Sequence, residues 1–184
     1  QRQQIIQGDE PLTPYIKAMI RRTIERQVAY ATEGERKDWQ LESLLEFAQN
    51  AIVSPDSISL ADLQNKDRQQ LINYLMGRAD AVYQSKMEQL NTPEQLAEFE
   101  KVVVLRVVDA KWTDHIDMMD HLRQGVGLRA YAQTNPLTEY QMEGYERFED
   151  MVSAIEYDVT RFIMKAQVRQ NVEREQINRP VNTN

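Results

Sequence analysis

Three side chains that could bind a divalent metal ion share one face of a predicted helix. Asp114, Asp117 and His121 follow one another at intervals of three and four residues, a spacing that places them on one side of an α-helix. Carboxylate and imidazole groups on facing helices form metal sites in helical bundles. The expected partner helix offers Tyr145 and Phe148 at this level, so we favour a solvated face or pairing with arginine side chains. A metal-dependent helical enzyme that uses these three residues is the alternative hypothesis.

Residues on which other enzymes rely are absent from the sequence. The chain has no cysteine, which excludes disulfides, cysteine–zinc sites and thiol nucleophiles and fits a reducing compartment. It has neither the G-x-x-x-x-G-K-S/T loop that binds phosphate nor the G-x-S-x-G turn of serine hydrolases. We therefore expect a chain that is not an enzyme and that holds no metal or cofactor.

A second candidate site is the stretch 124–136, a short break between two long helical patterns. No acidic residue lies between Asp120 and Glu139, whereas Arg123 and Arg129 lie inside this interval. The break is therefore locally positive in a chain whose net charge is -7. We interpret it as the exposed tip of a helical hairpin.

The tip combines flexible, apolar and aromatic residues. Gly125 and Gly127 are expected to loosen the end of the first helix. A tyrosine such as Tyr131 suits contact with a polypeptide, because its ring packs on apolar side chains while its hydroxyl reaches backbone groups. The alternative is that Leu128 and Tyr131 fold back and close the end of the hairpin. The candidate binding residues are Leu128, Arg129, Ala130, Tyr131, Ala132 and Gln133.

Two long helices are expected to position this tip. The first runs from about 93 to 124, roughly 48 Å at 1.5 Å per residue, and the second begins with Asn135 as N-cap and Pro136 at the first position. Two apolar stripes on the first helix predict that it is gripped from both sides; they are Leu96, Phe99, Val103, Val107 and Ala110, and Leu105, Val108, Trp112, Ile116 and Met119. A heptad seam predicts that the second helix packs antiparallel on the first; it is Tyr145, Phe148, Val152, Ile155, Val159, Phe162 and Ala166.

The rest of the chain also predicts helices, so the expected fold class is all-α. Thr13 as N-cap and Pro14 at the first position predict a helix, with an apolar face of Ile16, Ile20, Ile24 and Val28. From Asp38 to Asn91, shorter helices separated by polar turns predict a small inserted subdomain. Ser59 followed by Asp62 resembles a capping box. A further stripe in this segment consists of Leu71, Leu75, Ala79 and Val82.

The composition limits the possible partners. With 41% hydrophobic residues the 184-residue chain can bury a core, but its acidic balance argues against nucleic-acid binding. The longest apolar run, 102–105, is far shorter than the roughly 20 residues that span a bilayer, so any membrane contact is expected to be peripheral. Because the chain begins at Gln1 within a predicted helix, we expect a piece of a larger protein. Its oligomeric state does not follow from the sequence.

From Trp112 to Pro136 the sequence has the form W-x-x-H-x-x-x-M-D-x-L-R-Q-G-x-x-L-R-x-Y-A-Q-x-x-P. This pattern resembles the carboxy-terminal part of SecA, the motor ATPase of bacterial protein export. The resemblance implies a helical scaffold segment at 1–34, a helical wing at 35–92 and a scaffold two-helix finger at 93–170 with its tip at 124–136. Residues 171–184 would form a flexible tail.

The same resemblance implies a function. The fragment would couple ATP-driven movement of the absent nucleotide-binding domains, which hold ATP and Mg²⁺, to pushing preprotein into the SecY channel. Tyr131 would contact the translocating chain, and Trp112 and Arg123 would make scaffold contacts. The location would be cytoplasmic and peripheral at the inner face of the cell membrane.

Two departures from the SecA pattern bear on these expectations. Ala130 stands where the family usually has glycine, which affects the shape of the loop. The cysteine-rich zinc tail is absent, so no zinc is expected. A generic helical adaptor, in which the tip residues have no special role, is a third hypothesis.

Overall fold

The computed structural model describes residues 11–90, 92–129 and 135–167. Within these ranges every regular element is helical, which confirms the all-α fold class. The predicted segment 1–8 and the tail 171–184 lie outside the described residues. The α-helices are α2 (Thr13–Ala31), α3 (Leu41–Ala51), α4 (Ala61–Gln64), α5 (Arg68–Gln89), α6 (Pro93–Arg129) and α7 (Pro136–Lys165), with two 3-10 turns at Arg36–Asp38 and Pro55–Ser57.

Helix α2 buries the apolar face that its sequence predicts. Ile16, Ile20, Ile24 and Val28 are all at most 3% exposed. The predicted N-cap is wrong, because the cap position is taken by Leu12 and Thr13 lies in the first turn of the helix. The hydroxyl of Thr13 is used elsewhere in the structure, where it donates a hydrogen bond to a buried carboxylate of α6.

Helices α3 and α5 pack against α2, α4 packs against α3, and all three share the core of α2. Their buried side chains belong to one hydrophobic cluster with residues of α2, α6 and α7. Helix α5 begins with a capping box. The Asp67 carboxylate accepts from the backbone N–H of Gln70 at 2.8 Å, and the Gln70 side-chain oxygen accepts from the backbone N–H of Asp67 at 2.9 Å. Before α4, the Asp62 carboxylate accepts from the backbone amide of Ser59 at 2.8 Å. The predicted boundaries of scaffold, wing and finger stay a prediction.

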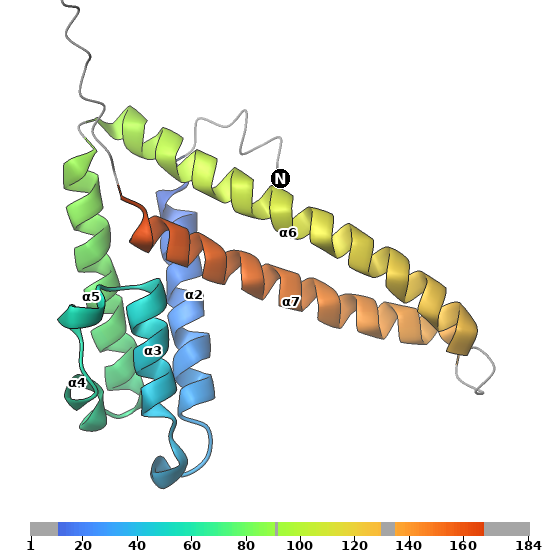
Figure 1. Ribbon diagram of the computed structural model, residues 1–184, viewed down its shortest axis with the longest axis horizontal. Helices are drawn as coiled ribbons and strands as arrows, with labels where there is room; N and C mark the ends of the chain where they lie inside the picture. Colours follow the sequence, from blue (N-terminus) through green and yellow to red (C-terminus); the bar gives the residue numbers. More distant parts are fainter. Residues whose placement is uncertain (1–10, 91, 130–134, 168–184) are drawn as a thin grey trace, which may run out of the picture.

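Helices α6 and α7 form a long antiparallel hairpin that extends well beyond the bundle of α2, α3, α4 and α5 (Figure 1). Helix α6 has 37 residues and α7 has 30, so α6 is about 55 Å long. The predicted break at Gln124 is wrong, because α6 continues through Gly125 and Gly127 to Arg129. Each glycine costs only about 1 kcal/mol in a helix interior, and Val126 between them is 4% exposed. Burial of Val126 offsets part of that cost.

The predicted contact faces of the hairpin are partly wrong. Trp112 and Ile116 are each 49% exposed, so the second stripe of α6 is only partly covered, although Val108 packs against the core. On α7, Tyr145 and Phe148 are 64% and 44% exposed, whereas Met151 and Val159 are buried. Away from the bundle each helix has one neighbour instead of several. A single neighbour covers a narrower face than the apolar pattern offers.

Candidate functional site: the helical hairpin

The tip of the hairpin is a short connection between two well-formed helix ends. Helix α6 ends at Arg129 and α7 begins at Pro136, with Asn135 as N-cap accepting from the amide of Leu137 at 3.0 Å. Of the predicted binding residues, Leu128 and Arg129 lie in the last turn of α6. Ala130, Tyr131, Ala132 and Gln133 lie outside the described residues, so their role stays a prediction.

The residues predicted to make scaffold contacts lie on the hairpin surface. Trp112 is half exposed and its ring centroid is 5.8 Å from that of His115. Arg123 has a side chain that is 72% exposed, with its guanidinium 3.3 Å from the carboxylate of Asp120. An exposed pair of this kind is worth at most about 1 kcal/mol. It nevertheless compensates part of the positive charge expected near the tip.

The residues of the metal hypothesis do not form a site. Asp114, Asp117 and His121 are all exposed on α6. Over the described ranges, no group of three or more histidine, aspartate or glutamate side chains could hold a metal ion. The structure therefore gives no support to metal-dependent chemistry on this face.

Aromatic and sulfur contacts hold the middle of the hairpin together. His115 is 9% exposed and lies between Trp112 on its own helix and Phe148 of α7, whose ring is edge-on at 6.0 Å. Farther toward the tip, Gly144 of α7 faces Met119 of α6. A Cβ atom at Gly144 would lie 3.0 Å from the terminal methyl of Met119. The helices thus approach closely because residue 144 has no side chain.

The base of the hairpin is fixed to α2 by a buried carboxylate, which we call the Glu156 clamp. Glu156 of α7 has a side chain that is 5% exposed. It accepts from Arg22 Nε at 2.5 Å and from Arg26 Nη2 at 2.6 Å, one arginine to each oxygen. Such charge-assisted bonds are stronger than neutral ones. The clamp joins residues more than 100 positions apart, so it sets how α7 lies on α2.

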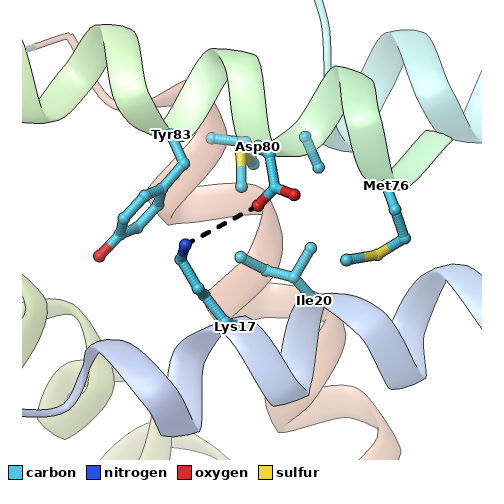
Figure 2. A pocket seen from close by; sticks show the side chains of 7 residues that line it. Lys17, Ile20, Met76, Asp80 and Tyr83 are labelled. Atoms are coloured by element: carbon cyan, nitrogen blue, oxygen red, sulfur yellow. Dashed lines mark ion pairs between the residues drawn. The ribbon is translucent and has the colours of Figure 1, made fainter. Parts of the chain in front are cut away.

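A second buried carboxylate fixes α6 to the bundle, and we call it the Glu100 junction. Glu100 is 1% exposed and accepts hydrogen bonds from the hydroxyls of Thr13 on α2 and Tyr83 on α5. Burial, together with the bond to Glu100, raises the pKa of Tyr83 well above its ordinary value. Figure 2 shows Lys17 of α2 beside the Tyr83 ring, with its ammonium 3.9 Å from Asp80 and 5.5 Å from the ring centroid. Because its raised pKa keeps the hydroxyl protonated, Tyr83 remains a donor to Glu100.

The sequence analysis did not identify either carboxylate. Glu100, Val104 and Val107 follow at helical spacing and are all at most 3% exposed. The available signal was a glutamate in register with two valines on one helix face. Glu156 likewise directly follows the predicted seam position Ile155. A charged residue on such a face predicts a partner, but the sequence does not say which helix supplies it.

Comparison with known protein families identifies a match over most of the chain. The protein-family model described as the SecA wing and scaffold domain matches residues 1–167. This range includes α2 through α7 and the predicted tip. Among the described helices none is both long and apolar enough to cross a membrane.

Proposed function

Because the chain belongs to the SecA wing and scaffold domain family, we propose that its α6–α7 hairpin is the two-helix finger that moves preprotein into the SecY channel. Involvement in protein translocation by SecA follows from the family itself. In the proposal, nucleotide-binding domains of the parent protein bind ATP and Mg²⁺ and generate the movement. The chain described here is a wing and scaffold part that transmits this movement and does not hydrolyse nucleotide.

The observation that carries the proposal is the shape of the hairpin and the way it is anchored. Two helices of 37 and 30 residues lie antiparallel and extend beyond the bundle (Figure 1). Their base is tied to α2 and α5 through the Glu156 clamp and the Glu100 junction. A hairpin fixed at one end can carry displacement of the bundle to a tip tens of ångströms away. Packing of α6 against α7 along the hairpin would supply the stiffness that this requires.

The proposed contact surface is the tip, residues 128–133. Tyr131 would meet the preprotein through its ring and hydroxyl, and Arg129 would add positive charge. Binding at the mouth of the SecY channel would place the protein on the cytoplasmic side, as a peripheral protein at the inner face of the membrane. Ala130 restricts the backbone more than glycine would, and it therefore limits the shapes available to this loop.

Substitution of the tip tyrosine in the intact parent protein tests the proposal. Tyr131→Ala should reduce preprotein export severalfold, because the substitution removes the main contact surface of the tip. Helical content and thermal stability should remain unchanged. Export into inverted membrane vesicles and circular dichroism are the two measurements.

A second tyrosine provides the matched control. Tyr145 is 64% exposed on α7 and lies about 14 Å along the helix from its first residue. Tyr145→Ala removes the same chemical group from the side of the hairpin and should leave export unchanged. Equal export by Tyr131→Ala and the parent, or equal losses for both variants, would contradict the tip assignment.

A further inference from the structure

A positively charged groove lies on the bundle, outside the hairpin and its tip. One wall is the face of α5 that carries Arg78, Val82 and Lys86, and the other is formed by Lys165 at the end of α7 and by residues 52–55 after α3. The groove is open to solvent and has a volume of about 910 Å³, within the upper range of ligand sites. Its size is sufficient for several residues of a peptide.

The lining of the groove has cations but no carboxylate. Arg78, Lys86 and Lys165 are its charged residues, in a chain whose net charge is -7. Asp62, which interacts electrostatically with Arg78, is not part of the lining. Among the described residues, no ion pair within 4.0 Å compensates any of the three cations. The groove is therefore an electropositive surface on an acidic protein.

Backbone carbonyls hold all three cations in place without neutralising them. Arg78 donates to the carbonyl of Ser57 at 2.7 Å. Lys165 donates to the carbonyls of Gln49 and Val53 near the end of α3, and Lys86 donates to the carbonyl of Ala166. An ammonium group has three donors, so donors remain for a ligand. Burial, and to a smaller extent the charge of Lys165, lower the pKa of Lys86, so some repulsion acts between the two cations. A bound anion would relieve this repulsion.

The spacing of the charges points to a peptide. Arg78 and Lys86 are eight residues apart on α5, which is about 12 Å along the helix. An extended chain rises about 3.3 Å per residue, so two carboxylates about four positions apart span the same distance. Between the cations, the apolar side chains of Val82 and Met164 line the groove. A single phosphate or lipid headgroup would reach only one end.

We propose that this groove binds an extended acidic segment of a partner protein, with two carboxylates about four residues apart and an apolar side chain between them. One carboxylate pairs with Arg78 and the other with Lys86 and Lys165. The apolar side chain packs near Val82. This interaction is separate from the proposed action of the finger tip.

Fluorescence anisotropy with the full chain tests the proposal. The probe is a labelled synthetic peptide with two glutamates about four positions apart and a leucine midway between them. It should bind at least about tenfold more tightly than the same peptide with glutamine in place of glutamate, a difference of about 1.4 kcal/mol. Placing the two glutamates next to each other should also weaken binding. Added salt should weaken it further.

Two variants of α5 give a matched comparison. Ser85 lines the groove, whereas the neighbouring Gln84 is exposed and is not in its lining. Ser85→Glu places a competing carboxylate in the groove and should weaken peptide binding about tenfold. Gln84→Glu adds the same charge on another face and should change binding less than twofold. Equal effects of the two variants, or equal binding of the glutamate and glutamine peptides, would overturn the proposal.

Two further measurements identify other occupants. Flotation with anionic phospholipid vesicles that is abolished by Ser85→Glu, without binding of the glutamate peptide, would show a lipid surface and refute a peptide partner. Hydrogen exchange in which residues 168–184 are protected and lose that protection when the peptide is added would identify the end of this chain as the natural occupant. That result would also overturn the proposal, even though the peptide binds.

Discussion

The Glu156 clamp predicts that Glu156→Gln lowers the stability of the parent chain but raises the stability of a variant that lacks Arg22 and Arg26. The Glu156 side chain is 5% exposed, whereas the side chains of Arg22 and Arg26 are 51% and 40% exposed. Removing the carboxylate therefore leaves two cations that water can reach. Removing the two arginines leaves an anion without its partners in a site that is much less open to water. The loss of stability should therefore differ between removing the carboxylate and removing the two arginines.

The magnitudes follow from the geometry of the clamp. Glu156→Gln weakens two charge-assisted bonds, each worth roughly 1.5–3 kcal/mol, and hydration of the arginines offsets part of the loss. We expect a cost of about 2 kcal/mol. Replacing Arg22 and Arg26 together with alanine should cost about 4 kcal/mol, the usual range for a buried charge left without its partner. In that background, Glu156→Gln removes the buried charge and should restore about 1 kcal/mol.

Urea unfolding followed by far-ultraviolet circular dichroism measures these free energies by linear extrapolation. The set comprises the parent chain, Glu156→Gln, the double arginine variant and the triple variant. Glu146→Gln is the matched control, because Glu146 is exposed on the same helix, and its effect should stay within about 0.5 kcal/mol. If Glu156→Gln destabilises both backgrounds equally, the argument from unequal hydration is wrong.

Two further predictions concern the Glu100 junction and the hairpin contact. Tyr83→Phe removes a donor to Glu100 and should cost about 2 kcal/mol at neutral pH. Because the pKa of Tyr83 in the folded chain is raised above 10.0, the contribution of its hydroxyl to stability is complete below about pH 10 and is lost as the pH rises further. Urea titrations at several pH values measure the difference in free energy of unfolding between the variant and the parent. A difference that stays constant up to about pH 11 would contradict this argument. At Gly144, alanine should change stability by less than about 1 kcal/mol, since helix propensity offsets a small movement of the flexible Met119 side chain. Leucine should cost about 1–3 kcal/mol by overpacking, and equal thermal melts for the two variants would disprove close packing there.

The parts of the fold that the sequence predicted well are those set by local pattern. The isoleucines of α2 at intervals of four residues are buried as expected. Asn135 and Pro136 begin α7 as predicted. Helix caps of this kind and amphipathic spacing depend on residues within one or two turns. Their outcome therefore needs little knowledge of the rest of the chain.

The buried faces of the hairpin could not be predicted in the same way. Helix α6 has apolar residues on two sides, and the pattern alone does not say how many neighbours are present. The bundle reaches only part of its length (Figure 1), so Val104 and Val107 are buried while Trp112 and Ile116 remain half exposed. The helix was predicted to end near Gly125, but α6 continues past it, and Val126 is buried at this point. Tertiary contact decided the outcome at each of these positions.

The two carboxylates explain how movement of the bundle would reach the tip. Helix α7 contacts α2 through the Glu156 clamp, and Lys165 at its end donates to carbonyls near the end of α3. Helix α6 is tied to α2 and α5 at Glu100 and otherwise lies along α7. A displacement of α2 therefore acts on both helices at their base, with α7 held at more points. Because Phe148 packs against His115 and Gly144 against Met119, α6 would follow α7 in the proposed function, and the two helices would move together.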